Sequence, residues 1–377
     1  MAMNRRSFLH SLGAAGAATT LLPLVQGRGL EAAVAPLRGG IAPSEIRLDS
    51  NENPYGPAPE VLRALAGWYE EAGRYPDFVI QNLRTALAAS LGVPEDHLIL
   101  GCGSGELLKV SVEAFMAADR HAVTASPTFE TVQSRATALK LPVRAPLVDK
   151  ALRIDLDAMV AAAPGAGLVF FCNPNNPTGT LHPTDAIEDA TMRVLRSAPD
   201  AMVLIDEAYF EYVDDPGYRS LIPLALAEPR VLVLRTFSKI YGMAGLRLGH
   251  VVAHPDAIAR MRPHLAPNNV NVLAAAAAMA SLPLTTHVRT EVARNAAVRE
   301  RTTRFFSGLG YAVVPSATNF VMVDVRRPVA AFRDACRAGG VLVGRPFAPL
   351  DTHARISLGT ADEMARAEPV FRQVLAG

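Results

Sequence analysis

One stretch of the sequence, residues 231–249 (VLVLRTFSKIYGMAGLRLG), constrains the fold and the chemistry of this chain more than any other. It opens with a run of apolar residues, which predicts a short buried β-strand. Polar residues follow at once, and glycines are spaced through the rest of the stretch. A lysine directly after a buried strand, here Lys239, is costly if it only packs in the interior. The stretch therefore predicts a strand that delivers Lys239 to a functional site.

The neighbours of Lys239 indicate which chemistry that site could hold. Desolvation lowers the pKa of a lysine, and a neutral lysine amine can form a Schiff base with an aldehyde. The hydroxyls of Thr236 and Ser238 and the guanidinium of Arg247 would suit a phosphate group beside that amine. Pyridoxal 5′-phosphate combines an aldehyde with a phosphate. A lone lysine is more often a surface residue in a loop, so the rest of the chain has to decide.

The composition describes a globular protein with a large core. A length of 377 residues suits two packed domains, and 50% hydrophobic with 19% charged residues excludes a disordered chain. A net charge of +1 gives no argument for a nucleic-acid partner. The cysteines, Cys102, Cys172 and Cys336, are too few for a disulfide framework and fit no metal-site spacing. We expect all of them to be buried small apolar residues.

The first 35 residues do not resemble the rest of the chain. Arg5 and Arg6 precede an Ala/Gly-rich apolar run over 12–25, which is too short and weakly hydrophobic to span a membrane stably. Residues 1–35 resemble a bacterial twin-arginine export signal, with a cleavage site at 33–35. This resemblance predicts a periplasmic or otherwise exported protein. The alternative is a disordered extension on a cytoplasmic protein.

A second strand-and-loop unit precedes the lysine stretch. Residues 97–100 predict a strand, a glycine-rich loop (GCGSGE) follows, and apolar periodicity predicts a helix over 107–118. A glycine-rich loop between a strand and a helix points free backbone N–H groups at a phosphate. The N–H groups of Gly103, Ser104 and Gly105 are the candidates here.

Other predicted strands end in residues suited to a planar ring. Phe129 follows strand 122–124 and could stack on a ring. Asn176 lies in a rigid Pro/Gly loop after the apolar run 167–172 and has a side-chain N–H to donate. Asp206 ends the next strand, where a buried carboxylate needs a partner such as a protonated ring nitrogen.

The C-terminal part predicts a smaller α+β domain. Residues 311–359 alternate strand patterns around a helix at 329–338. Within them, Arg355 occupies an inward strand position, where a guanidinium suits a bidentate clamp on a carboxylate.

The motifs, in the order in which they occur along the chain, resemble those of the class I/II aminotransferases of fold-type I, which depend on pyridoxal 5′-phosphate. S-K-x-x-G-x-x-G-x-R-x-G around Lys239, N-P-N-N-P-T-G around Asn176 and D-E-A-Y after Asp206 carry the resemblance. N-E-N-P-Y-G-P at 51–57 and the amino-acid sequence of 235–249 look most like the histidinol-phosphate aminotransferase branch. The resemblance covers about residues 44–375.

The resemblance implies a role for each residue. Lys239 would hold the cofactor and move the substrate proton, Asp206 would keep the ring nitrogen protonated, and Tyr209 would share the phenolic oxygen with Asn176. Tyr75 would reach across a homodimer interface to the neighbour's cofactor phosphate. The substrate-side residues would be Tyr55, Asn319, Arg345 and Arg355.

The chain departs from the family pattern at a few positions. Gly105 stands where relatives have an acidic residue, so the phosphate loop lacks a side chain there that could fix it. Phe129 and Val132 stand where relatives often have hydroxylated or aromatic residues, which bears on substrate choice.

The family implies an α/β fold with a three-layer α/β/α large domain near 58–265. A smaller α+β domain would join 36–57 to 266–377, and the site would lie between the domains at the strand ends.

The implied activity is transamination between an amino donor and a 2-oxo acid, with 2-oxoglutarate as the usual acceptor. Histidinol phosphate and aromatic or other amino acids remain open as donors, and so does racemisation or decarboxylation on the same scaffold. A regulatory protein on this fold would usually carry a DNA-binding domain, and nothing before residue 44 resembles one.

Overall fold

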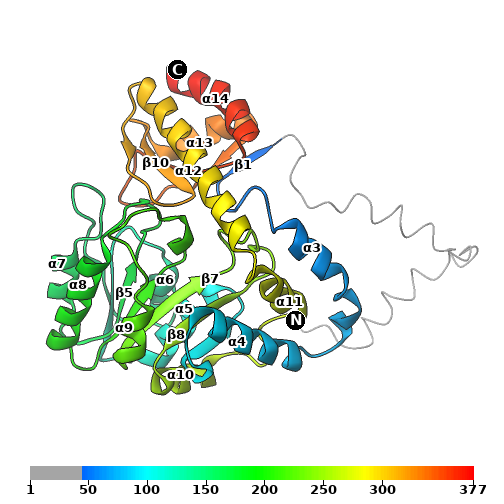
Figure 1. The fold of residues 1–377 in the computed structure, drawn as a ribbon. Coiled ribbons are helices and arrows are strands. Elements are labelled where there is room, and N and C mark those ends of the chain that lie inside the picture. Colours follow the sequence, from blue (N-terminus) through cyan, green and yellow to red (C-terminus); the bar gives the residue numbers. More distant parts are fainter. Residues whose placement is uncertain (1–44) are drawn as a thin grey trace, which may run out of the picture. The chain divides into compact units, whose positions relative to one another are not determined.

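The computed structural model describes residues 45–377. The predicted export signal and its cleavage site lie outside the described residues, so they stay predictions. Residues Ile46–Gly377 pack as one compact unit, which contains one large sheet and two small ones (Figure 1). Within this described part, no helix is long and apolar enough to cross a membrane.

A seven-stranded sheet lies at the centre of the larger part of this unit. Strand β8 runs antiparallel to both neighbours, whereas the other neighbouring pairs are parallel. The central strands are buried along their whole length, which explains their uninterrupted apolar sequences. In sheet order the strands are β2 (Leu98–Gly101), β8 (Gly249–Ala253), β7 (Val231–Thr236), β6 (Met202–Asp206), β5 (Ala166–Cys172), β3 (His121–Thr124) and β4 (Val143–Arg144).

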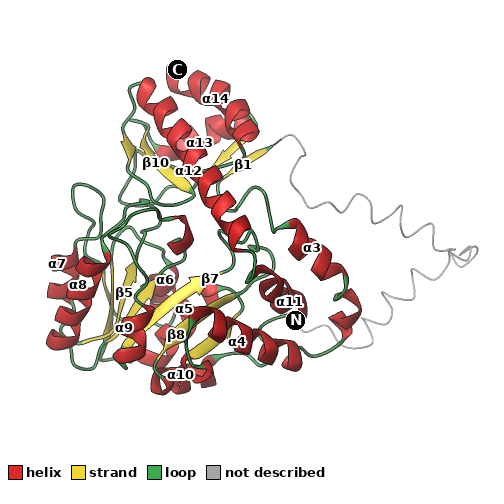
Figure 2. Ribbon diagram, in the orientation of Figure 1, coloured by secondary structure: helices red, strands yellow, loops and turns green. Residues whose placement is uncertain are grey.

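Helices cover both faces of this sheet (Figure 2), which confirms the predicted three-layer α/β architecture. One face packs against α3 (Pro59–Ala66), α4 (Asp77–Leu91), α7 (Leu156–Ala162), α8 (Thr184–Ser197), α9 (Ile222–Ala227) and α11 (Val272–Ser281). The other face packs against α5 (Ser104–Phe115), α6 (Thr131–Ala138) and α10 (Pro255–Met261).

The strand directions bring the predicted motifs to one edge of the sheet. The parallel strands β3, β5, β6 and β7 end at the same edge, and so does β2, because the antiparallel β8 separates it from β7. At that edge the first residue of β8, Gly249, pairs with both Gly101 and Thr236. The loops that carry Gly103, Asn176 and Lys239 therefore start at the same edge of the sheet.

The C-terminal part carries two small sheets. The bounds of its elements are β1 (Ile46–Leu48), α12 (Thr285–Gly308), β9 (Val313–Val314), β10 (Phe320–Asp324), α13 (Val329–Ala338), β11 (Val341–Val343), β12 (His353–Ser357) and α14 (Ala361–Ala376). Strand β1 pairs with β11 in parallel, and β12, β10 and β9 form the other sheet. The chain segment before α3 is thus tied to C-terminal elements. The domain boundaries given above stay a prediction.

One predicted helix boundary is wrong. Helix α5 begins at Ser104, earlier than the apolar periodicity indicated, because the polar first turn belongs to the helix as well.

Candidate active site

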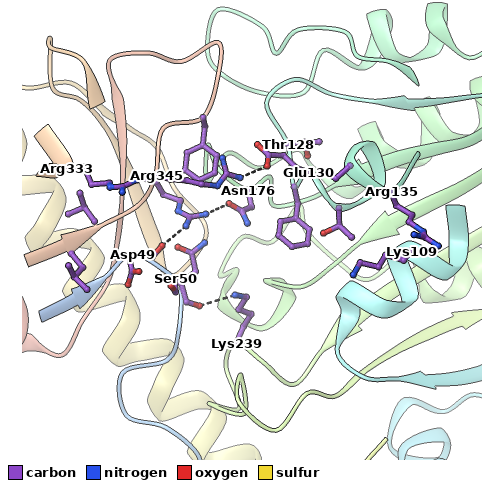
Figure 3. Close-up of a pocket in the computed structure, with 18 of the residues that line it drawn as sticks. Asp49, Ser50, Lys109, Thr128, Glu130, Arg135, Asn176, Lys239, Arg333 and Arg345 are labelled. Atoms are coloured by element: carbon purple, nitrogen blue, oxygen red, sulfur yellow. Dashed lines mark hydrogen bonds and ion pairs between the residues drawn. The ribbon is translucent and has the colours of Figure 1, made fainter. Parts of the chain in front are cut away.

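A cavity of about 910 Å³ opens between the site edge of the large sheet and strands β11 and β12 (Figure 3). Its wall contains residues from both parts of the described unit. The predicted site residues that line it are Phe129, Asn176, Lys239, Arg345 and Arg355.

Lys239 follows β7 and points its amine into the cavity (Figure 3). Its Nζ donates a hydrogen bond of 3.1 Å to the backbone oxygen of Asn51 and lies 5.6 Å from the centre of the Tyr209 ring. Burial and the nearby charge of Arg355 lower the pKa of Lys239 to about 8, against the opposing pull of Asp206. The amine can therefore lose its proton near neutral pH, as nucleophilic and proton-transfer chemistry requires.

Asp206 ends β6 and is buried close enough to Lys239 for their charges to interact. Burial raises the pKa of Asp206 to about 7, although the N–H of Ala208 donates to its carboxylate at 2.9 Å. Such a carboxylate is matched to a partner that carries a proton, such as a ring nitrogen. Beside it, burial raises the pKa of Tyr209, so its phenol stays protonated and can donate.

A cluster of donors surrounds the start of α5. Thr236 Oγ1 donates to Ser238 Oγ at 3.0 Å, and Arg247 Nη1 donates to the same oxygen at 3.4 Å. Gly103, with φ +73°, lies so close that a Cβ there would sit 2.3 Å from Nη2 of Arg247. Ser104 begins the helix, so free backbone N–H groups face this cluster. The donor set fits a phosphate.

Glu106 fixes the glycine-rich loop. This role of Glu106 was not predicted from the sequence. Its Oε2 accepts hydrogen bonds from the N–H of Cys102 at 2.7 Å and from Asn269 Nδ2 at 2.6 Å. The absence of an acidic side chain at Gly105 therefore does not leave the loop without an anchor. Cys102 itself is only partly buried, unlike Cys172 and Cys336, so the expectation for this cysteine was wrong.

Asn51 joins several parts of the site and was also missed. Its backbone oxygen accepts from Lys239 and, at 3.0 Å, from Asn319 Nδ2. Its side chain donates to Tyr209 Oη at 3.1 Å and accepts from Ser357 Oγ at 2.8 Å. The residue has φ +53°, a conformation that asparagine tolerates better than most residues. The motif N-E-N-P-Y-G-P begins with this residue and was the available signal.

The same motif packs on the loop that follows Lys239. Asn53 Nδ2 donates to the backbone oxygen of Ile240 at 2.9 Å. Gly242 has φ +67°, and a Cβ there would lie 2.1 Å from the backbone of Gly56. The glycine of S-K-x-x-G is thus required by the close approach of two backbones.

Arg355 projects from β12 into the cavity and is 8% exposed. Its Nη1 donates to Asn176 Oδ1 at 2.8 Å, and its Nη2 donates to the backbone oxygen of Asp49 at 2.7 Å. Among residues 45–377 its Nε finds no acceptor, and burial lowers its pKa to about 10. A buried guanidinium with a spare donor is suited to the anionic group of a ligand.

Arg345 lies at the outer end of the same cavity and is half exposed. It forms an ion pair with Glu130, which directly follows Phe129 in the sequence (Figure 3). Sequence reasoning placed Arg345 in the site but gave Glu130 no role.

Other predicted residues lie outside this cavity in the single chain. Tyr55 lines a separate small cavity, with the Arg294 guanidinium 4.9 Å from its ring centre, and Tyr75 is 80% exposed. Asn319 uses its side-chain nitrogen to hold the backbone oxygens of Asn51 and Glu52. The substrate and cofactor roles assigned to these residues stay predictions.

Comparison with known proteins identifies the family. Residues 43–368 match the family described as aminotransferase class I and II. The chain is 38% identical over 339 residues to a histidinol-phosphate aminotransferase of Moorella thermoacetica, covering 88% of this chain and 86% of that protein. It is also 38% identical over 320 residues to an aromatic amino acid aminotransferase of Thermobifida fusca, covering 84% and 87% of the two chains.

A solved structure agrees with the sequence comparison. The histidinol-phosphate aminotransferase of Sinorhizobium meliloti, solved in complex with pyridoxal-5′-phosphate, is 28% identical and superimposes with a TM-score of 0.82. The match covers 96% of this chain and 99% of that one. The predicted resemblance is confirmed: this chain is a member of the class I and II aminotransferases and has the fold-type I architecture.

Proposed function

We propose that this aminotransferase moves an amino group from a donor held by Arg355 to a 2-oxo acid, using pyridoxal 5′-phosphate bound at Lys239. One observation carries the proposal: the Lys239 amine lines the cavity with Arg355, and it is close enough to the buried Asp206 and to the Arg355 guanidinium for both charges to act on its lowered pKa. The cofactor supplies an aldehyde that takes up the donor's amine and a ring that accepts the electron pair of the donor's Cα–H bond.

The residues of the chain divide the remaining work. The hydroxyls of Thr236 and Ser238 and the guanidinium of Arg247 bind the phosphate. Asp206 would keep the proton on the ring nitrogen, and Asn176 and Tyr209 would donate to the phenolic oxygen. The neutral amine of Lys239 would take the proton from the donor Cα and later give one to the aldehyde carbon of the cofactor.

Two classes of donor fit this arrangement. Histidinol phosphate is favoured by the names of several relatives, and an aromatic amino acid is favoured by the name of another. Arg355 suits either the phosphate of the first or the α-carboxylate of the second. We propose 2-oxoglutarate as the acceptor, because its α-carboxylate can use the same guanidinium.

We also propose that the enzyme is a homodimer. Tyr75 and Phe78 are 80% and 88% exposed next to the start of α4, which is unusual for large aromatic side chains. A second copy would cover them and bring Tyr75 to the neighbour's phosphate site. Sedimentation of the full chain, with Phe78→Asp as the disruptive variant, tests this proposal.

The direct test of the cofactor site is chemical trapping. Full-length protein loaded with pyridoxal 5′-phosphate is reduced with borohydride, digested and mapped. We expect the label on Lys239. The Lys109→Arg variant is the control, because Lys109 lies on the same cavity wall and is the competing amine. A label on Lys109, or on none of the lysines, would refute the assignment.

The donor is tested by a half-reaction screen. The absorbance of the loaded enzyme is followed while histidinol phosphate, aromatic, aliphatic and acidic amino acids are added singly. Transamination predicts loss of the absorbance of the cofactor attached to Lys239 and its recovery on addition of 2-oxoglutarate. Loss without recovery by any oxo acid would contradict the proposed reaction.

A further inference from the structure

An ion pair lies in the wall of the cavity. Glu130 lies between Phe129 and the first residue of α6, and its carboxylate pairs with the guanidinium of Arg345, which follows β11. The two side chains are 45% and 50% exposed. The pair therefore connects Glu130, next to the cavity-lining Phe129, to the C-terminal part of the described unit (Figure 3).

Arg345 is held by more than this pair. Its Nη1 donates to the backbone oxygen of Pro346 at 3.0 Å, and its guanidinium lies 4.3 Å from the ring centre of Phe347. The guanidinium of Arg355 lies 4.7 Å from the centre of the same ring. The two arginines that could receive the anionic group of a donor are thus neighbours on one aromatic ring, and they differ in one respect. Arg345 already has a carboxylate partner, whereas Arg355 is paired with neutral oxygens.

From this difference we infer that Glu130 determines the class of amino donor by occupying Arg345, so that the site selects an amino acid over a phosphate monoester. This inference rests on the proposed function and names the substrate class of that same site. Glu130 acts here as a positioning residue, through Arg345.

The physical reason is charge matching. A phosphate monoester carries a charge of about −1.5 to −2 near pH 7 and is best held by more than one cationic donor. To use Arg345 as well as Arg355, it would have to displace Glu130 and leave that carboxylate unpaired beside the phosphate, which is unfavourable. A single α-carboxylate needs Arg355 alone and leaves the ion pair intact.

The intact pair also shapes the place for the donor's side chain. A neutralised pair flanked by the rings of Phe129 and Phe347 suits an uncharged or aromatic group. The other charged residues that line the cavity, besides Lys239 and Arg355, are the basic Lys109, Arg135, Arg333 and Arg337 and the acidic Asp49. Glu130 is one of two carboxylates in this lining and the one that pairs with Arg345, so a change of its charge should alter selection between donors.

The test compares two donors on the loaded full-length enzyme. We measure kcat/KM for L-phenylalanine and for L-histidinol phosphate with wild type, Glu130→Gln, and the double variant Glu130→Gln/Arg345→Gln. Glutamine keeps the size of Glu130 and removes its charge. Glu300→Gln is the matched control, because Glu300 forms an exposed ion pair with Arg304 on α12, away from the cavity.

We expect wild type to prefer phenylalanine. Glu130→Gln should shift the ratio of kcat/KM values about three- to tenfold toward the phosphate donor, mainly through a lower KM, as freeing one partly exposed charged partner allows. The double variant should lose this gain, because the freed Arg345 is what receives the phosphate. Glu300→Gln should leave the ratio unchanged.

A binding measurement provides a second readout. Calorimetric titration of the loaded enzyme with inorganic phosphate should show tighter binding to Glu130→Gln than to wild type, and no gain in the double variant. An unchanged ratio and unchanged phosphate binding in Glu130→Gln would overturn the inference, as would a gain that survives in the double variant. Failure of every donor in wild type would instead refute the proposed function.

Discussion

Nη1 of Arg355 donates a hydrogen bond of 2.8 Å to Oδ1 of Asn176. A guanidinium can only donate, so the amide oxygen of Asn176 must face Arg355 and its NH₂ group must face away. One contact therefore orients the amide donor proposed for the cofactor's phenolic oxygen and the guanidinium proposed for the donor's anionic group. It also joins β12 to the loop that follows β5.

Replacing Arg355 with alanine should weaken substrate binding far more than cofactor binding. The loss of one charged hydrogen-bond partner costs about 1.5–3 kcal/mol, so we expect KM for an amino acid donor to rise roughly ten- to a hundredfold. Steady-state kinetics with the preferred donor measures this effect, and cofactor loading by absorbance is the internal control. Arg345→Ala should raise KM for the same donor only slightly. Equal, small effects of both substitutions on every donor would contradict the roles given to both arginines.

The amine of Lys239 should react with pyridoxal 5′-phosphate in its neutral form. In the cofactor-free protein the attachment rate should therefore rise with pH to a midpoint near the pKa of about 8, below the ordinary lysine value of 10.5. The charge of Asp206 raises the pKa of Lys239, so Asp206→Asn should move the midpoint to lower pH. Stopped-flow absorbance from pH 6 to 10 measures both midpoints. A midpoint near the ordinary lysine value would show that the amine is not desolvated.

Removal of the Asp206 carboxylate should leave attachment of the cofactor to Lys239 intact but slow turnover. Asp206→Ala should still be labelled at Lys239 after borohydride reduction, because the amine and the phosphate donors remain. Turnover should fall by an amount typical of a preorganised charge contact, about 3–4 kcal/mol, because nothing then holds the proton on the ring nitrogen. Single-turnover kinetics with the best donor measures the loss. Turnover close to that of wild type would remove Asp206 from the mechanism.

The glycine-rich loop offers a matched pair of substitutions. Gly103→Ala would place a Cβ 2.3 Å from the Arg247 guanidinium at φ +73°, so Arg247 would have to move out of the phosphate cluster. We expect the Kd for pyridoxal 5′-phosphate to rise about tenfold or more, as for the loss of one charged donor. Gly105→Ala is the control, because a Cβ there meets nothing within 4 Å and the backbone N–H is kept. Fluorescence titration gives both constants. Equal Kd values for the two variants would show that crowding of Arg247 is not what weakens cofactor binding in Gly103→Ala.

The export proposal is tested by fractionation of cells that express the full chain. Arg5→Lys together with Arg6→Lys should keep the enzyme in the cytoplasm if residues 1–35 are a twin-arginine signal. Wild-type protein should appear in the periplasm with its cofactor bound, because this route moves folded proteins. Export of both forms in equal amounts, or of neither, would contradict the signal.

Much of the fold and the position of the central site residues could be predicted from local sequence. Uninterrupted apolar runs indicated the central strands, because a strand buried on both faces has no polar alternation. Each run ended in polar residues, which placed Asp206, Thr236 and Lys239 at strand ends. The family motifs then indicated that these strands belong to one parallel sheet. Because parallel strands run in the same direction, their carboxyl ends were expected at one edge of that sheet.

Several polar partners could not be predicted in this way. Asn51 meets Ser357 across 306 positions of sequence, and Glu106 meets Asn269 across 163. Such residues look like ordinary loop or helix-start polar groups, because propensity and periodicity describe only a local segment. Their partners are set when the chain segments dock.

The sequence by itself determined the fold class, the family and the lysine and aspartate of the site, since these follow from local hydrophobic patterns and short motifs. The tertiary structure alone decided that Arg345 is paired with Glu130, 215 positions away, while Arg355 faces the cavity with a donor to spare. Both arginines follow or lie within short C-terminal strands and look alike in sequence. The charge that each presents to a donor depends on which side chains the folded chain brings within hydrogen-bond distance, and no local pattern records that.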